Sequence, residues 1–321
     1  MKRHLPLHGA TLLAATLACA LCAAQDVNNA TATQNGAGNR AYISQTDNTE
    51  GVFVTVIQNG NNNVVGDPAS QTGGVQQYQA SDLFMTISQT GDANRATATQ
   101  RSGQRTGFVL AQTGTANVTA VRQDEAYETV SRVTQAGVNN RVEGDAASTL
   151  TNGFTARQVG ADHVLSVYNR NNGFSNSYTD QNGVANRIAI EQTAVGYTFH
   201  DIAQFGERNR VTAVSADALF TDYAITQNGT ENIATARTSA EASNGDLLQT
   251  GERNAATTGQ QGRNSAFSIT QSGSFNTAQL AQNGTIATPD NNVATIRQNG
   301  QRLDATLAQT GGGNQGIINQ R

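Results

Sequence analysis

Residues 83–100 read LFMTISQTGDANRATATQ, and this stretch decides the fold. Every second residue from Leu83 to Ile87 is apolar, and Gln89 closes the run, which is the period of a half-buried β-strand. Residues 90–93 have the composition of a tight turn, with Gly91 able to take a positive φ. The same alternation then resumes from Asn94 to Gln100. The stretch therefore predicts a strand, a turn and a second strand.

The pattern Gln-x-Gly-x-x-Asn inside this stretch returns about every 23 residues along the chain. We count 12 full units and a half unit that ends at Gln320. The leading glutamines are Gln34, Gln58, Gln89, Gln112, Gln135, Gln158, Gln181, Gln204, Gln227, Gln249, Gln271 and Gln298. The regular third and sixth positions are Gly91, Gly114, Gly137, Gly160, Gly183, Gly206, Gly229, Gly251, Gly273 and Asn94, Asn117, Asn140, Asn186, Asn209, Asn232, Asn254, Asn276, with His163 as the one departure. A period this regular predicts one supersecondary unit stacked many times.

A second glutamine closes the second strand in many of these units. It occurs at Gln45, Gln71, Gln100, Gln123, Gln192, Gln260, Gln282 and Gln309, whereas Ala146, Asn169, Ser215 and Thr238 replace it elsewhere. We therefore predict an all-β fold, a β-solenoid of about 12 strand-turn-strand rungs whose strands form two facing parallel sheets, with ~4.8 Å between rungs. Two interruptions, around Pro68 and Pro289, lengthen the spacing, and we interpret Thr72–Ser81 as a further insertion.

Inward-pointing amides need a physical reason, because a buried amide without a partner costs free energy. In a parallel, in-register stack each Gln or Asn lies over its equivalent in the next rung, so amides can hydrogen-bond in a continuous ladder. We assign stacking and self-assembly to the leading glutamines, to the asparagines at the sixth position and to the second-strand glutamines. The glycines at the third position are assigned to the turns.

Arginine often follows the motif asparagine, at a position expected to face outward. Arg95, Arg141 and Arg187 skip alternate rungs, which keeps like charges about two rungs apart. Arg210 breaks this alternation, because it falls on the rung directly after Arg187.

The N-terminal 24 residues are typical of an export signal. A basic start at residues 2–4 precedes an apolar run at 11–23, and small residues allow cleavage after Ala24. The run is shorter than the ~20 residues that a membrane-spanning helix needs. Residues 1–24 are thus expected to be a signal peptide and residues 25–321 the repeat domain. Cleavage would remove Cys19 and Cys22, the two cysteines of the chain.

Composition and the scatter of reactive residues argue against several functions. Charged residues make up 14% of the chain, Trp is absent, and the arginines form no basic cluster, so we expect no nucleic-acid binding. The acidic residues are scattered, and His163 and His200 stand singly. We therefore expect no enzymatic activity, no cofactor, no metal site and no small-molecule substrate.

Residues 265–282, SAFSITQSGSFNTAQLAQ, resemble the curlin repeat through Ser265, Gln271, Gly273, Asn276, Ala278 and Gln282. The pattern extends over about residues 28–320. The resemblance implies a subunit of curli, the bacterial surface amyloid fibres that serve biofilm matrix and adhesion. It also implies passage through the periplasm, secretion through a dedicated outer-membrane pore, nucleation at the cell surface by a nucleator subunit, and the chain itself as the main binding partner.

Two alternatives stay open at this point. The chain could be a minor, nucleator-type subunit rather than a major one. It could also be a monomeric β-solenoid that binds another molecule, as an adhesin or an ice-binding protein does. A disordered Gln/Asn-rich chain is disfavoured, because low complexity alone does not keep a 23-residue phase over seven units.

Overall fold

The computed structural model describes residues 15–16, 28–48, 51–66, 75–79, 81–147, 152–170, 173–193, 196–216, 220–239, 241–284 and 291–321. The chain divides into two compact units, residues 1–162 and residues 163–321, and each is described by itself. The described residues contain no helix, and so none that is long and apolar enough to cross a membrane.

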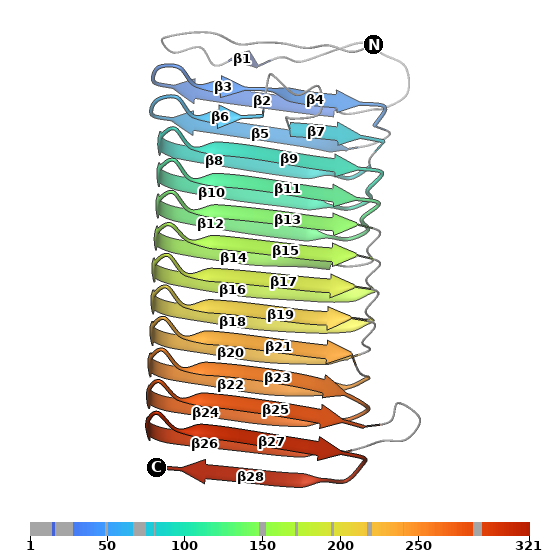
Figure 1. Cartoon of the computed structure of the whole chain (residues 1–321). Helices are drawn as coiled ribbons and strands as arrows, with labels where there is room; N and C mark the ends of the chain where they lie inside the picture. The colour runs from blue at the N-terminus through green and yellow to red at the C-terminus, as the bar shows by residue number, and fades with distance from the viewer. Residues whose placement is uncertain are drawn as a thin grey trace. The chain divides into compact units, whose positions relative to one another are not determined.

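Unit 1 consists of parallel strands that alternate between two sheets (Figure 1). The first-strand sheet, whose strands carry the leading glutamines, contains β2 (Asn28–Asn35), β5 (Val52–Asn59), β8 (Phe84–Asp92), β10 (Gly107–Thr115), β12 (Val130–Val138) and β14 (Asn152–Ala161), and β1 (Ala15–Thr16) joins β2 antiparallel. The second-strand sheet contains β3 (Arg40–Ala41), β4 (Ile43–Thr46), β6 (Val64–Val65), β7 (Val75–Tyr78), β9 (Arg95–Arg101), β11 (Val118–Asp124) and β13 (Arg141–Ala147).

Unit 2 repeats this arrangement with greater regularity. Its first-strand sheet contains β16 (Phe174–Val184), β18 (Tyr197–Glu207), β20 (Thr221–Thr230), β22 (Ser243–Glu252), β24 (Ala266–Ser274), β26 (Val293–Gln301) and β28 (Gln315–Gln320). Its second-strand sheet contains β15 (Val164–Arg170), β17 (Arg187–Thr193), β19 (Arg210–Ala216), β21 (Ile233–Ser239), β23 (Ala255–Gln261), β25 (Thr277–Asn283) and β27 (Asp304–Thr310). All strand pairs within this unit are parallel.

The strands stack in register, so equivalent residues of successive repeats lie side by side. Gln89 pairs with Gln112, and Gln112 pairs with Gln135. Burial alternates along each strand, as in β8, where Met85, Ile87 and Gln89 are buried. Because side chains of a strand point alternately to its two faces, one face of each sheet packs inward and the other meets solvent.

The interior between the two sheets is narrow and is built from columns of matching residues. In unit 1 one such column is Val56, Ile87, Leu110, Val133 and Ala156. In unit 2 the corresponding column is Thr179, Ile202, Ile225, Leu247, Ile269 and Ile296. These mostly apolar columns make up only part of the interior. Buried glutamine, asparagine, serine and threonine side chains fill the rest.

The fold predicted from the sequence is confirmed, since the structure is a β-solenoid of about 11 turns with two parallel sheets. Among the described strands, five complete rungs lie in unit 1 and six in unit 2. The sequence count of 12 also includes the repeat of Gln158, whose strands β14 and β15 fall in different units.

One detail of the sequence interpretation is wrong. We expected Thr72–Ser81 to be an insertion, but β7 lies within it and Gln77 pairs with both Gln45 and Gln100. Gln77 thus takes the place expected for Gln71. The structure does not describe Gln71, Pro68 or Pro289, nor, apart from Ala15 and Thr16, residues 1–24, which we expected to be a signal peptide.

Candidate assembly site: the amide ladders

The leading glutamines form a continuous hydrogen-bonded ladder inside unit 1. Each Nε2 donates to the Oε1 of the glutamine in the next rung, and Gln112 shows the geometry with 2.8 Å to Gln135. The other steps, Gln34 to Gln58, Gln58 to Gln89, Gln89 to Gln112 and Gln135 to Gln158, measure 2.7, 2.8, 2.8 and 2.9 Å. All but Gln34 are fully buried.

Unit 2 contains an equivalent ladder. It runs from Gln181 through Gln204, Gln227, Gln249, Gln271 and Gln298 to Gln320, with steps of 3.0, 2.8, 2.7, 2.8, 2.9 and 2.9 Å. Every donor points in the same chain direction, so one side of a rung presents amide donors and the other presents acceptors.

The second amide hydrogen of these glutamines joins the two sheets. Gln204 Nε2 also donates to the backbone carbonyl of Arg187 at 3.0 Å, in the second-strand sheet of the preceding rung. Gln112 does the same with Arg95 at 3.0 Å. A glutamine reaches this carbonyl because its side chain spans the narrow interior. This contact explains why the position is glutamine and not an apolar residue.

The motif asparagines clamp the turn of the next rung. Asn117 Oδ1 accepts a hydrogen bond from the backbone N–H of Asn140 at 3.1 Å, while its Nδ2 donates to the carbonyl of Gly137 at 3.0 Å. Asn94, Asn140, Asn186, Asn209, Asn232, Asn254 and Asn276 each donate to the equivalent glycine carbonyl at 2.8–3.1 Å. An amide supplies the donor and the acceptor that this clamp needs.

The turn glycines are required by both conformation and space. Gly91, Gly114, Gly137, Gly160, Gly183, Gly206, Gly229, Gly251 and Gly273 all have φ between 103° and 127°. A Cβ on Gly114 would lie 2.1 Å from the carbonyl oxygen of Gly137, the same oxygen that Asn117 binds. The residue before each asparagine is also left-handed without being glycine, as Ala116 is at φ 57°. The sequence pattern gave no sign of this second left-handed residue.

The ladder of the second-strand glutamines is interrupted. Gln45, Gln77, Gln100 and Gln123 are joined at 2.9, 3.1 and 2.8 Å, and Gln260, Gln282 and Gln309 at 2.8 and 2.8 Å. Gln123 donates instead to Ser131 Oγ at 3.1 Å. Gln192, which we placed in the ladder, forms no hydrogen bond with a glutamine among the described residues, and its Nε2 lies 2.7 Å from His200 Nδ1.

His200 and Tyr223 fill the interior where this ladder is absent. His200 Nε2 lies 3.2 Å from Ser215 Oγ, and its ring lies 5.8 Å from that of Tyr223. Burial lowers the pKa of His200 to about 4, so the ring is neutral at pH 7. His163 takes an asparagine position, and its Nδ1 accepts from the backbone N–H of Asn186 at 3.3 Å.

Several residues that we did not assign make the same contacts. Asn39 and Asn63 clamp the first turns, and both fit Gln-x-Gly-x-x-Asn in the sequence. Asn292 and Asn314 form an equivalent clamp near the last strand of unit 2, where the backbone N–H of Asn314 donates to Asn292 Oδ1 at 2.9 Å. Here Gln309-x-Gly-x-x-Asn314 repeats the motif. A scan for the motif alone, without its 23-residue spacing, finds all of these except Asn292.

Two facing parallel sheets with in-register amide ladders place the chain among the repeat β-solenoids. Within that class, residues 240–273 match the family model of the curlin associated repeat. The matched segment contains Gln249, Gly251 and Asn254, and it ends with Gln271 and Gly273. No curated protein shows a significant match to the chain.

Proposed function

We propose that this protein is a curli-type structural subunit that is exported and stacks with other copies into extracellular fibres. The observation that carries the proposal is the polarity of the ladders. Within each unit, every rung presents the amide donor of its leading glutamine to one neighbour and the acceptor to the other, with no change of pattern between rungs. A rung of a second copy could therefore replace the next rung of the same chain without altering any of these contacts.

The backbone offers the same complementarity. Apart from β1 and β2, the strands within each unit pair in parallel with equivalent residues opposed, so a strand at an uncovered edge can accept an identical strand. Buried glutamines at such an edge would otherwise hold unpaired amides, which costs free energy. Addition of another copy would satisfy the backbone and the amides together.

The family match supports membership of the curlin family. It covers residues 240–273, and the motif of that segment continues over about residues 34–320 with the same contacts. Membership would imply a location at the cell surface that is reached through the periplasm. The partners would be a nucleator subunit and an outer-membrane pore, and the role would lie in biofilm matrix and adhesion. A nucleator-type role for this chain is the alternative within the same family. We propose a non-catalytic role in either case.

The proposal is tested with the purified chain after removal of residues 1–24. We expect fibres that bind thioflavin T and that diffract X-rays at ~4.8 Å along the axis and ~10 Å across it. Preformed fibres should shorten the lag phase when added as seeds. A folded chain that stays monomeric and soluble at high concentration, with or without seeds, would contradict the proposal.

Location is tested separately. Antibody labelling on intact cells should mark surface fibres, and deletion of residues 1–24 should retain the protein inside the cell. Protein confined to the cell interior in both cases would contradict the export part of the proposal alone.

A further inference from the structure

The outward face of the first-strand sheet in unit 2 is aromatic and acidic. Phe174, Tyr197 and Phe220 stack along it with ring centroids 4.9 and 5.0 Å apart and interplanar angles of 9° and 8°. Their exposed fractions are 43%, 49% and 58%, so the rings stand in solvent. We name these three residues, together with Asp201, Asp222 and Asp246, the acidic face.

The three aspartates of the acidic face lie close together. Asp201 and Asp246 belong to one column of the sheet, separated by Ala224, and Asp222 lies on the strand between them. The pKa of Asp222 is raised, first by partial burial and then by the charges of Asp246 and Asp201. None of the three forms an ion pair with a residue that the structure describes. The acidic face thus holds negative charge that nothing in the described residues neutralises.

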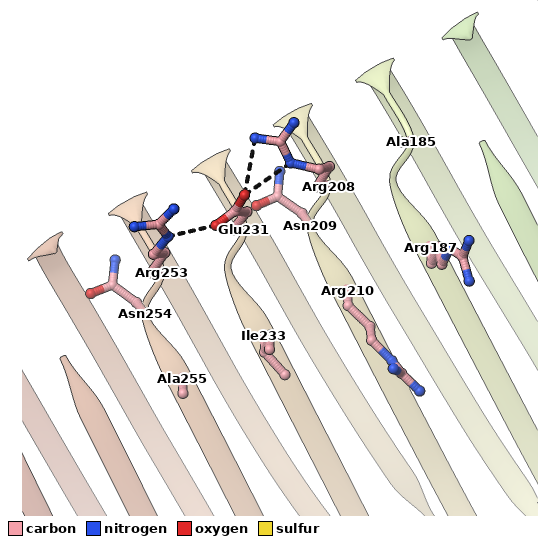
Figure 2. Close-up of a pocket in the computed structure, with 10 residues that line it drawn as sticks. All are labelled: Ala185, Arg187, Arg208, Asn209, Arg210, Glu231, Ile233, Arg253, Asn254 and Ala255. Atoms are coloured by element: carbon pink, nitrogen blue, oxygen red, sulfur yellow. Dashed lines mark hydrogen bonds and ion pairs between the residues drawn. The ribbon is translucent and has the colours of Figure 1, made fainter. Parts of the chain in front are cut away.

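The opposite face of unit 2 carries unpaired arginines. Arg187 and Arg210 are directly opposed on β17 and β19, which places their Cα atoms ~4.8 Å apart. Figure 2 shows both side chains extending along the sheet, away from Glu231. Neither forms an ion pair with a described residue, and opposed like charges destabilise a sheet. We name Arg187 and Arg210 the arginine pair.

The neighbouring arginines differ in this respect. Arg208 and Arg253 lie on the adjacent turns and share Glu231, with N–O distances of 3.0 and 2.5 Å (Figure 2). These residues and the arginine pair line one groove, in which Ile233 and Ala255 continue the column of the arginine pair (Figure 2). The groove therefore offers two free guanidinium groups beside an apolar strip.

We propose that the acidic face of one molecule docks side by side on the arginine pair and its groove in a second copy. Charge complementarity favours this partner, since each face holds a cluster of one sign. Spacing favours it as well, because the three aspartates lie on three successive strands of their sheet and the two arginines on two successive strands of theirs, all at the rung spacing of the same solenoid. A polymer with another repeat length could match only some of these charges.

Aromatic rings add to the fit. A guanidinium group binds the face of an aromatic ring, as Arg253 does at 5.3 Å from the ring centre of Phe275. Phe174, Tyr197 and Phe220 already stack face to face, so they present apolar ring edges, which Ile233, Ala255 and the methylene groups of the arginine pair can cover. The contact joins unlike faces, so it can propagate from molecule to molecule.

Charge reversal on each face tests the proposal. The variants are Arg187→Glu with Arg210→Glu, and Asp201→Arg with Asp222→Arg, and Arg297→Glu is a control on the outward face of β26 outside both patches. Sedimentation velocity of freshly purified chain measures side-by-side dimers, and electron microscopy measures the width of bundles. We expect each double variant alone to weaken association at least tenfold, and an equimolar mixture of the two to restore it. The control should behave as the wild-type chain.

Circular dichroism first establishes that each variant keeps its strand content. If the arginine variant loses association and the mixture does not regain it, the arginine pair binds some other anion and the proposal is wrong. Association unchanged in both double variants would also overturn it. Seeded elongation should proceed normally in both variants, so failure of side-by-side docking is distinguishable from failure of end-to-end stacking. Dimers can form even if fibres never do.

Discussion

Gln282 Nε2 lies 2.8 Å from Gln309 Oε1, and the same nitrogen lies 3.1 Å from the backbone carbonyl of Ala266. Gln282 Oε1 in turn accepts a hydrogen bond from Gln260 at 2.8 Å. One fully buried side chain thus joins two neighbouring rungs and both sheets. Removing its amide leaves a buried donor and a buried acceptor without partners.

Gln282→Leu should therefore destabilise the chain although it keeps the volume of the side chain. We expect a loss of about 2–3 kcal/mol in the free energy of unfolding, because the amides of Gln260 and Gln309 lose their partner. Urea unfolding measures the loss. Gln279→Leu on the same strand is the matched control, since Gln279 faces solvent, and it should change the free energy by less than about 0.5 kcal/mol. Equal losses in the two variants would show that the ladder adds no stability.

The turn glycines give a second prediction, for Gly251→Ala. Gly251 has φ 113°, and a Cβ there would lie 2.0 Å from the carbonyl oxygen of Gly273. We expect a loss of about 2 kcal/mol or more, since the left-handed conformation alone costs about 1–2 kcal/mol and the rungs must also separate. Thermal unfolding measures the change. Gly259→Ala is the control, because Gly259 has ordinary φ and no heavy atom within 4 Å of the new Cβ. A Gly251→Ala variant as stable as the control would refute the close-approach argument.

The third prediction concerns the donor of the asparagine clamp. Asn232→Asp keeps the oxygen that accepts from the Asn254 backbone N–H at 3.1 Å. It loses the Nδ2 that donates to Gly251 at 2.9 Å and to Asn209 Oδ1 at 3.1 Å. A carboxylate would then face two oxygens in a buried site, so we expect a loss of about 3 kcal/mol at pH 7.

The same variant should respond to pH in a defined direction. Burial against oxygens raises the pKa of the new carboxyl group above its unfolded value, so the variant regains stability as pH falls through that raised pKa and the group becomes a donor. The measurement is the difference in unfolding free energy from the wild-type chain between pH 7 and pH 4. Asn283→Asp, at an exposed position of β25 opposite Gln261 and Thr310, serves as the control. A difference independent of pH would argue against the buried carboxyl.

His200 gives a fourth prediction. Its pKa is lowered by burial from 6.5 to about 4, so the unfolded chain binds this proton at a higher pH than the folded chain. The contribution of neutral His200 to the free energy of unfolding is fully present above about pH 6.5. It is lost as the pH falls toward 4, and the total loss is about 3 kcal/mol. His200→Gln removes the titration. The difference in unfolding free energy between the wild-type chain and the variant should therefore shrink or reverse over that range, and an unchanged difference would contradict a buried neutral His200.

Much of the architecture followed from residue order alone. A side-chain period of two fixes which residues of a strand face inward, and the 23-residue repeat fixes which residues oppose one another. Gln112 therefore had to lie beside Gln89 and Gln135 once the strands were parallel and in register. The glycine of each turn could be read in the same way, since few other residues take positive φ.

The partners of individual polar residues were decided only in three dimensions. Gln77 and not Gln71 continues the ladder after Gln45, because a connection of irregular length lets any of several glutamines reach the interior. Gln192 meets His200 because the strand on the other sheet places a histidine where the preceding rung has Ser177. The repeat determined the register of the strands. The contacts across the interior, and the contrast between the acidic face and the face of the arginine pair in unit 2, came from the tertiary structure. The physical reason is that a hydrogen bond or a charge pair depends on which side chain lies within a few ångströms, and the linear period does not specify that distance.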